Sequence, residues 1–407
     1  MNAAILSTGD ELIIGKTLDT NAYWLINQLT NLNVNVVCQI DVGDVKSEIR
    51  WGLESAISHA ELVVMTGGLG PTDDDLTRFV LAEMLGVELL LHEPSLRQIE
   101  NFFAARNRPM NERNRVQAMI PQGAEVLDNP NGTAPGIKVS IGQCAIFCLP
   151  GVPREMKGMF DLYVKPWVLE RTPQTHFFRK LHCIGIGESD LVHKIDDLVR
   201  EHRSKVIFGT TANEGIISIG LAGKDKSALD ALERAIQLRL GNIIFGCDDQ
   251  TLPECVGALL RQRRQTLATA ESCTGGLLGK ILTDPPGASD YYLGGFVCYS
   301  NTLKHNLLSV PEELLITHGA VSDPAAQAMA RGALMKTNAD WALSVTGIAG
   351  PTGETAEKPV GLVYIGLAGK NGTQQVREFR FGSPGREVVR FRAAISALDM
   401  LRHAMSD

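Results

Sequence analysis

The sequence predicts an α/β protein in which two three-layer α/β/α domains flank a smaller α+β unit. Short apolar segments alternate with helical patterns over residues 1–172 and again over residues 250–407. Such alternation is typical of a mainly parallel sheet with helices on both faces. Glycine-rich polar segments follow several expected strands, where ligands bind in sheets of this kind. Pro173 and the polar residues after it mark a boundary, so we expect domains at 1–172, 173–249 and 250–407.

The composition limits the classes of function. The chain has 407 residues, enough for two or three domains with sizeable cores. Its formal net charge of −7 gives no support for a nucleic-acid-binding surface, so nucleic acid is not an expected partner. No segment has the roughly 20 apolar residues of a membrane span, and the first residues do not look like a signal peptide. The eight cysteines lack zinc-ligand spacing, so we expect a cytoplasmic protein with reduced thiols.

The first domain begins with a strand, a helix and a second strand, expected at 3–7, 21–32 and 34–40. A helix around Leu53 and a continuous apolar strand at 62–65 follow. Later, a strand at 145–149 leads into Pro150–Pro153, where Pro153 suits the first position of a helix.

The most informative segment of this domain is Thr66–Asp75, which directly follows a buried strand. Three glycines in it allow backbone N–H groups to wrap a phosphate, namely Gly67, Gly68 and Gly70. Asp73–Asp75 supply carboxylate oxygens that suit a divalent cation of unspecified identity, and Asp74 or Asp75 is expected to hold it. A purely structural interpretation stays open, in which Thr72 caps the next helix and Asp75 occupies its third position.

The middle unit reads as a strand, a helix, two strands and a helix. The strand begins near His176, and the other elements are expected at 191–202, 205–208, 215–221 and 226–240. Basic and acidic residues balance here, so the unit lacks the positive surface of an RNA-binding domain. We interpret it as a spacer or dimerisation module.

The last domain repeats the alternation of strands and helices. Its strands are expected at 266–270, 295–299, 342–346, 361–367 and 376–381. Helices are expected at 253–263, 274–283, 302–308 and 324–336, and a long final helix runs from Pro384 to about Met405.

The stretch Thr266–Lys304 carries the strongest chemical signal. Ser272 stands between a buried strand and a helix, beside the glycines Gly275 and Gly276. Tyr299 ends the next strand and Lys304 follows five residues later. A serine activated by a lysine base is a recognised form of nucleophilic catalysis. The alternative is structural: Ser272 and Thr274 are good helix caps, and Lys304 is then one surface lysine among many.

Three blocks of this domain resemble the C-terminal domain of the competence/damage-inducible CinA family: Thr269–Gly276, Gly295–Asn301 with Lys304, and Ser344–Pro351. The resemblance implies deamidation of nicotinamide mononucleotide, without a cofactor. It also places six residues around the nucleotide: Ser272, Ser289, Tyr299, Lys304, Thr346 and Arg386. On this basis we assign Ser272 as nucleophile, Lys304 as base and Tyr299 as a group that orients Lys304 or passes a proton.

The remaining roles follow from the same assignment. The N–H groups of Thr274, Gly275 and Gly276 would stabilise the oxyanion. Thr346–Gly347 and Arg386 would hold the phosphate or ribose. Cys273 remains an alternative nucleophile, because a helix N-terminus lowers the pKa of a thiol. A nucleotide-binding sensor or adaptor without catalysis is also left open.

The first domain resembles the N-terminal CinA domain, which is related to molybdopterin-binding domains. The matching blocks are Gly9–Leu12, Asp19–Asn21, Thr66–Thr72 with Asp74 and Asp75, Gly132–Gly136 and Leu149–Pro153. The resemblance implies a metal-dependent ADP-ribose pyrophosphatase with Asn21 and Thr133 near the phosphates. A molybdopterin-binding protein is the alternative. The middle unit resembles the family's KH-like domain, and the family resemblance implies a homodimer acting in pyridine nucleotide salvage.

Overall fold

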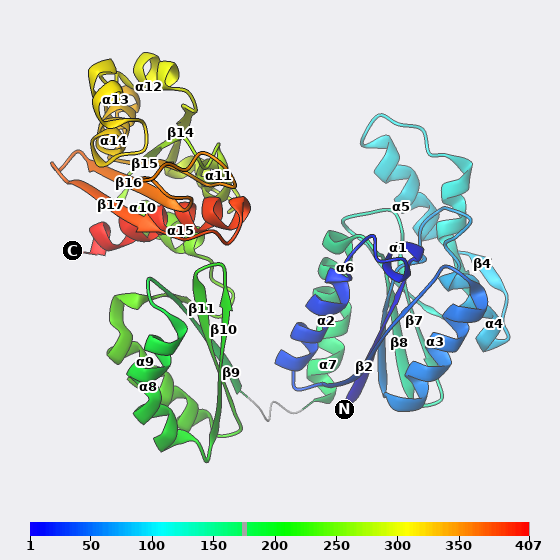
Figure 1. The fold of residues 1–407 in the computed structure, drawn as a ribbon. Helices are drawn as coiled ribbons and strands as arrows, with labels where there is room; N and C mark the ends of the chain where they lie inside the picture. The colour runs from blue at the N-terminus through cyan, green and yellow to red at the C-terminus, as the bar shows by residue number, and fades with distance from the viewer. Residues whose placement is uncertain (173–176, 407) are drawn as a thin grey trace. The chain divides into compact units, whose positions relative to one another are not determined.

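The computed structural model describes residues 1–172 and 177–406, which form two compact units, Met1–Phe177 and Phe178–Asp407 (Figure 1). The middle and last predicted domains therefore share one compact unit. The boundary expected at 173–176 lies outside the described residues. None of the helices in the described ranges is both long and apolar enough to cross a membrane.

The first unit contains a six-stranded sheet in the order β2-β1-β3-β8-β7-β6. Its strands are β1 (Asn2–Thr8), β2 (Asn35–Val42), β3 (Leu62–Thr66), β6 (Glu125–Leu127), β7 (Gly136–Ile141) and β8 (Cys144–Leu149). The four strands β2, β1, β3 and β8 are parallel to one another, whereas β7 runs antiparallel to both of its neighbours, β8 and β6. A separate antiparallel pair joins β4 (Leu89–Leu91) to β5 (Met119–Pro121). The predicted mainly parallel sheet is confirmed.

Helices cover both faces of this sheet (Figure 1). They are α1 (Asp10–Ile13), α2 (Thr20–Asn31), α3 (Lys46–His59), α4 (Thr77–Leu85), α5 (Glu93–Ala104), α6 (Pro153–Met159) and α7 (Lys165–Arg171), with a 3-10 turn at Glu112–Ala118 and a π turn at Phe160–Val164. Successive side chains of β1 point to opposite faces of the sheet, so the strand contributes to the core on each face. Ala3 and Ile5 pack in one core with α2, α6 and α7, whereas Ala4 and Leu6 pack in the other with α3 and α4.

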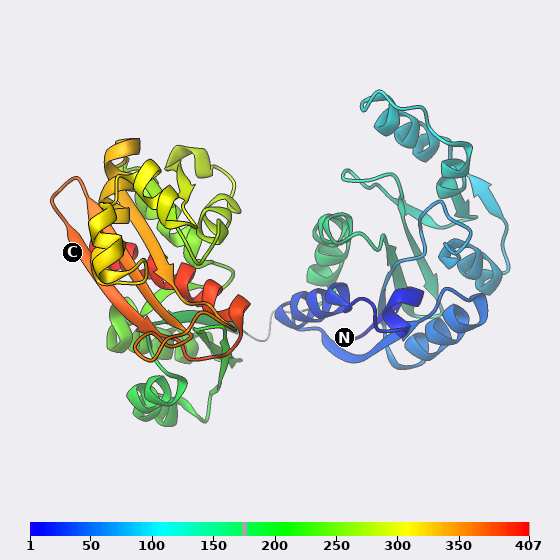
Figure 2. The same cartoon turned by 45° about the horizontal axis from the view of Figure 1, so that its top comes forward.

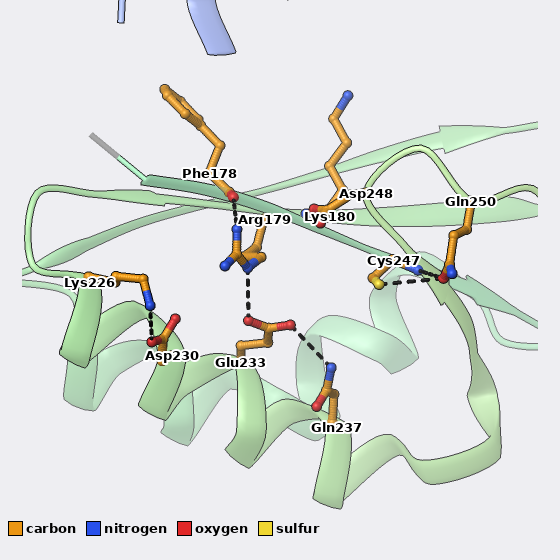
Figure 3. Close-up of polar contacts among 10 residues, drawn as sticks. All are labelled: Phe178, Arg179, Lys180, Lys226, Asp230, Glu233, Gln237, Cys247, Asp248 and Gln250. Carbon is orange, nitrogen blue, oxygen red and sulfur yellow. Dashed lines mark hydrogen bonds and ion pairs between the residues drawn. The ribbon is translucent and has the colours of Figure 1, made fainter. Parts of the chain in front are cut away.

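The middle part of the second unit has a four-stranded sheet in the order β10-β11-β9-β12, together with two helices. Its elements are β9 (Phe177–Ile184), α8 (Glu188–His202), β10 (Val206–Asn213), β11 (Ile216–Gly223), α9 (Lys226–Leu240) and β12 (Ile244–Cys247), with a 3-10 turn at Gly241–Ile243. Polar contacts tie the sheet to α9, as in the 3.3 Å ion pair between Arg179 and Glu233 (Figure 3).

The last part of the chain forms a five-stranded sheet in the order β14-β13-β15-β16-β17. Its strands are β13 (Leu267–Glu271), β14 (Tyr292–Val297), β15 (Trp341–Gly347), β16 (Leu362–Gly369) and β17 (Gln374–Arg380). Strands β13, β14 and β15 are parallel to one another, whereas β16 runs antiparallel to both of its neighbours, β15 and β17. The carboxyl ends of β13, β14 and β15 therefore meet at one edge.

Helices again cover both faces of this sheet (Figures 1 and 2). One layer contains α10 (Leu252–Arg263), α11 (Leu277–Thr283) and α15 (Arg386–Ser406), and the other contains α12 (Asn301–Leu308), α13 (Glu312–His318) and α14 (Asp323–Thr337). A 3-10 turn at Ala288–Asp290 precedes β14. The C-terminal half of α15 also contacts the middle part, because Arg402 donates to the carbonyl of Asn242. The α/β prediction, with a small module between two layered domains, is confirmed.

Candidate active sites

Ser272 and Lys304 meet at the carboxyl edge of the last sheet. Ser272 directly follows β13, and Lys304 lies one turn into α12, which Ser300 caps by accepting the N–H of Leu303. Lys304 Nζ is 2.9 Å from Ser272 Oγ. Both side chains are buried, with exposed fractions of 8% for Ser272 and 1% for Lys304. The interpretation of Lys304 as one of many surface lysines is wrong.

The surroundings of Lys304 make its ammonium group easier to deprotonate than an exposed one. Besides Ser272, Nζ has two partners, the carbonyl oxygens of Cys298 at 2.9 Å and Tyr299 at 3.2 Å. Burial lowers the pKa of Lys304, since removing the ammonium group from water disfavours its charged form. A neutral amine has two hydrogens and one lone pair. As an ammonium group Lys304 donates to all three oxygens; once it has lost a proton, the two carbonyls can accept both remaining hydrogens, and the lone pair can accept the hydrogen of the serine hydroxyl.

Glu271 changes the expected source of oxyanion stabilisation. Its buried carboxylate accepts the N–H groups of Gly276, Leu278 and Gly279 at 2.8–3.0 Å, so it occupies the N-terminus of α11. The N–H of Gly275 donates to the carbonyl of Ser272. The expectation that Gly275 and Gly276 donate to an oxyanion is therefore wrong.

Two donors of the same turn remain available. Apart from the contact of the Cys273 N–H with its own thiol, nothing among the described residues accepts a hydrogen bond from the N–H groups of Cys273 and Thr274. They adjoin Ser272 in the chain, where an oxyanion on an attached acyl group would form. The turn therefore offers two N–H donors rather than the three predicted.

The Cys273 thiol is in the wrong environment for a nucleophile. Burial raises the pKa of Cys273 to about 12, and the nearby Glu271 carboxylate acts in the same direction. The expected lowering of the thiol pKa is overturned, because the effect of burial outweighs the lowering by the Cys273 N–H, Lys304 and Arg390.

Tyr299 and Arg386 contact each other at the rim of this site. Arg386 donates to the Tyr299 hydroxyl at 3.2 Å and to the carbonyl of Gly350 at 2.9 Å. The Tyr299 side chain is 60% exposed, and its backbone carbonyl rather than its hydroxyl contacts Lys304. Tyr299 thus orients Lys304 through its main chain.

The other predicted residues are less closely grouped. Thr346 and Gly347 end β15 at the same edge, but the Thr346 hydroxyl donates to the carbonyl of Ala320 at 2.8 Å. Ser289 is exposed and precedes β14, whose first residue pairs with Leu267 at the start of β13. Ser289 therefore lies at the opposite end of the parallel strands from Ser272, and within one chain the structure does not bring it to the site.

Arg390 is a contact that the sequence reasoning missed. Its guanidinium donates through Nε and Nη2 to the carbonyl of Thr274, at 3.2 and 2.6 Å. It follows Arg386 by one helical turn of α15, so both side chains lie on one helix face. This four-residue spacing from Arg386 is the feature of the sequence that could have identified Arg390. These two hydrogen bonds from Arg390 hold the turn that follows Ser272.

In the first unit, the glycine loop after β3 borders a cleft of about 400 Å³. The predicted Gly67, Gly68, Gly70 and Thr72 line this cleft, as does Thr133. A side chain on Gly67 would lie 2.5 Å from the carbonyl oxygen of Thr8, so the chain itself requires glycine there.

Thr77 orients the loop. Its hydroxyl donates to the carbonyl of Gly67 at 3.0 Å, and its N–H donates to that of Gly68 at 3.2 Å. In a trans peptide the N–H points away from the C=O. The N–H groups of Gly68 and Leu69 therefore point away from Thr77, and nothing in the described ranges accepts them. Such successive N–H groups form an anion-binding concavity.

The two predicted metal ligands have different environments. Asp75 accepts the N–H of Gly70 at 2.6 Å and both the N–H and hydroxyl of Thr72, so its carboxylate fixes the loop. Asp74 is exposed and has no partner among the described residues. The alternative helix-cap interpretation is wrong, since α4 starts at Thr77 and Leu76 is its N-cap.

The cleft is strongly acidic. Five carboxylates line it, and no lysine or arginine of the described chain does: Glu11, Asp44, Asp74, Asp75 and Glu155. Within the described ranges, no three His, Cys, Asp or Glu side chains form a ready-made metal site. The donor set fits a hard cation such as Mg²⁺, which is commonly held by one or two carboxylates together with substrate phosphates.

Asn21 does not face the glycine loop as a phosphate donor. Its amide nitrogen donates to the carbonyl of Gly151 at 2.7 Å, and it lines a smaller neighbouring pocket instead of the main cleft.

Comparison with known families divides the chain into three matches. Residues 4–170 match the probable molybdopterin binding domain, residues 178–246 match the damage-inducible protein CinA KH domain, and residues 249–405 match the CinA C-terminal domain.

Whole-length relatives carry the same name. The chain is 42% identical to a CinA-like protein of Anaeromyxobacter sp., over 100% of this chain and 99% of that protein. It is 41% identical to a CinA-like protein of Crocosphaera subtropica over the full length of both. A crystal structure of the competence/damage inducible protein CihA from Agrobacterium tumefaciens is 42% identical, covers 38% of this chain and 94% of its own, and has a TM-score of 0.38. The chain therefore belongs to the CinA family of competence/damage-inducible proteins.

Proposed function

We propose that the second unit deamidates nicotinamide mononucleotide to nicotinate mononucleotide and ammonia. The observation that carries this proposal is the buried contact of 2.9 Å between Lys304 Nζ and Ser272 Oγ. A lysine base needs a lowered pKa, and burial lowers that of Lys304. The resemblance of the surrounding blocks to the CinA deamidase domain supplies the substrate.

The reaction proceeds in two halves. Ser272 Oγ attacks the carboxamide carbon while its proton moves to Lys304 Nζ, and the carbonyl oxygen becomes an oxyanion near the N–H groups of Cys273 and Thr274. The tetrahedral intermediate collapses with loss of ammonia, which takes the proton from Lys304. Water then attacks the resulting ester, Lys304 accepts the water's proton and returns it to Ser272 Oγ, and the carboxylate product leaves.

The test is a product assay on the purified full chain with nicotinamide mononucleotide in excess EDTA. We expect stoichiometric ammonia and nicotinate mononucleotide. Lys304→Met should lower kcat by about 10²- to 10⁴-fold, the usual effect of losing a general base. A wild-type protein that binds the nucleotide without releasing ammonia would instead support a sensor or adaptor.

A second function is favoured by the cleft of the first unit. We propose that it hydrolyses the pyrophosphate of ADP-ribose with a divalent cation. Free N–H groups of Gly68 and Leu69 suit a phosphate, yet five carboxylates line the same cleft and no lysine or arginine of the described residues does. A bound divalent cation would neutralise phosphate charge and lower the pKa of water. Asp74 is the free carboxylate best suited to help hold it, while Asp75 supports the loop.

The two aspartates give separable results. Asp74→Asn should abolish Mg²⁺-dependent release of AMP from ADP-ribose without changing thermal stability. Asp75→Asn should lower both the rate of AMP release and the thermal stability, because it disturbs the hydrogen bonds to Gly70 and Thr72. Full metal-dependent turnover in both variants would refute the assignment.

A further inference from the structure

The sheet of the first unit ends in polar residues on the face covered by α2. Ala3 and Ile5 of β1 pack in the core beneath α2, and Ser7 is the next residue of that face. Ser7 pairs in register with Asp41 of β2 and Thr66 of β3. An apolar column that ends in a hydroxyl at the carboxyl edge of parallel strands indicates a ligand site rather than more core.

Three oxygen atoms at this edge are buried and lack a hydrogen-bond partner among the described residues: Ser7 Oγ, Asp19 Oδ2 and Asn21 Oδ1. Ser7 is 1% exposed. The orientation of Asn21 is fixed, because its Nδ2 donates to the carbonyl of Gly151 and so leaves Oδ1 as an acceptor. Buried polar atoms almost always have a partner, and an unsatisfied one costs about 1–3 kcal/mol. These three atoms therefore call for hydrogen-bond donors from a ligand.

All three residues line a pocket of about 160 Å³ between the end of β1 and the start of α2. Glu11 and Gly151 line both this pocket and the cleft of the glycine loop, so the two spaces adjoin. Glu11 and Asp19 add carboxylates, and no lysine or arginine of the described residues lines the pocket. It is thus suited to hydroxyl donors and unsuited to a phosphate.

We propose that this pocket binds the hydroxyl groups of a sugar attached to the phosphate that the glycine loop holds. Asn21 Oδ1 accepts one hydroxyl hydrogen, and Ser7 Oγ accepts another or donates in return. This inference rests on the phosphate site proposed above and assigns the neighbouring part of the same ligand. It gives Asn21 the role of a sugar acceptor in place of the phosphate-binding role predicted from the sequence.

The test compares three ligands by calorimetric titration of the full chain with Ca²⁺ present: ADP-ribose, ADP and inorganic pyrophosphate. Ser7→Ala should weaken binding of ADP-ribose about fivefold or more, the equivalent of one hydrogen bond, and leave pyrophosphate within about twofold. Ser58→Ala is the matched control, since Ser58 is exposed on α3 and bonds within its own helix. Ser7→Ala should not lower the melting temperature of the unliganded protein, because it removes an unpartnered hydroxyl.

A comparison of ADP with ADP-ribose also identifies which of the two riboses binds in the pocket. An equal loss for ADP and ADP-ribose assigns the pocket to the adenosine ribose, and a loss for ADP-ribose alone assigns it to the terminal ribose. Either result supports the inference. An equal loss for pyrophosphate overturns it, as does unchanged binding of ADP-ribose by both Ser7→Ala and the pocket-filling Ser7→Val. If pyrophosphate fails to bind the wild-type protein while Ser7→Ala still weakens ADP-ribose, the phosphate site is wrong and the sugar pocket is retained.

Discussion

At the scale of single residues, the chemistry of the second unit depends on how burial acts on two neighbouring groups. Burial lowers the pKa of Lys304 and raises that of Cys273 to about 12. The same removal from water therefore raises the fraction of the amine that is neutral and able to accept a proton, and lowers the fraction of the thiol that is a nucleophilic thiolate. This difference favours Ser272 as the proposed nucleophile, because its hydroxyl needs a base at contact distance and the Lys304 amine lies 2.9 Å away.

The lowered pKa of Lys304 predicts two pH dependences. The rate constant kcat/KM should rise with pH and level off above a pKa below the ordinary lysine value of about 10.4. The contribution of Lys304 to the free energy of unfolding should also increase with pH. Between the folded and unfolded pKa values the unfolded chain binds more protons at Lys304, so the stability of the wild type relative to Lys304→Met should increase with pH. Calorimetry of both proteins across this range checks the second dependence, and a falling difference would contradict the pKa direction.

Glu271 supports a separate prediction about the turn that holds Ser272. Glu271→Gln places an amide NH₂ against backbone N–H donors, so it should destabilise the second unit by about 2–3 kcal/mol and lower deamidation. Glu387→Gln, an exposed change in the first turn of α15, is the control. Thermal unfolding measures the effect, and equal melting temperatures for the two variants would show that the carboxylate does not hold the turn.

At the scale of elements, strand–loop–helix units present both candidate sites. Most of these elements were predictable, because apolar periodicity located the strands of both sheets and parallel strands bring their carboxyl ends together. This explains why Ser272 and Lys304 meet although 32 residues separate them in the sequence. The helix expected from Thr274 begins at Leu277 instead, after a turn that Glu271 stabilises.

Side-chain directions were not predictable in the same way. Nothing in the sequence states that Glu271 folds back onto its own helix or that Asp75 bonds its own loop. Ser289 was misplaced because a resemblance assigns a residue to a site without saying at which end of a strand it lies. Arg390 was overlooked although its spacing from Arg386 placed both on one face of the final helix.

The glycine loop of the first unit yields a prediction at this scale. Thr77→Val keeps the shape of the side chain but removes the hydrogen bond to the Gly67 carbonyl, which should cost about 1–2 kcal/mol. It should also weaken pyrophosphate binding, because the peptide that presents the Gly68 N–H is no longer held. Thr283→Val, whose hydroxyl bonds within its own helix, is the control for titration calorimetry. Unchanged binding would mean that Thr77 does not orient the loop.

At the scale of the whole molecule, the two candidate sites lie in different compact units. Both proposed substrates are breakdown products of a dinucleotide, so one chain would carry two steps of pyridine nucleotide salvage. The middle module belongs to the same unit as the Ser272 site, and Arg402 near the end of α15 anchors it there. The first two turns of the same helix hold Arg386 and Arg390, so one element connects the module to the site.

Separate units predict separable activities. Ser272→Ala should leave Mg²⁺-dependent cleavage of ADP-ribose unchanged within about twofold, and Asp74→Asn should leave ammonia release unchanged to the same extent. Parallel assays of both products on each variant provide the check. A loss of both activities in a variant that keeps the wild-type melting temperature would mean that the two sites depend on each other.

The most direct test of the account is ammonia release from nicotinamide mononucleotide by Ser272→Ala and Cys273→Ala, measured side by side. We predict that Ser272→Ala loses at least about 10³-fold in kcat, since it removes the nucleophile, whereas Cys273→Ala keeps most of the wild-type rate. The opposite pattern, with an active Ser272→Ala and an inactive but folded Cys273→Ala, would contradict the assignment of Ser272 and Lys304.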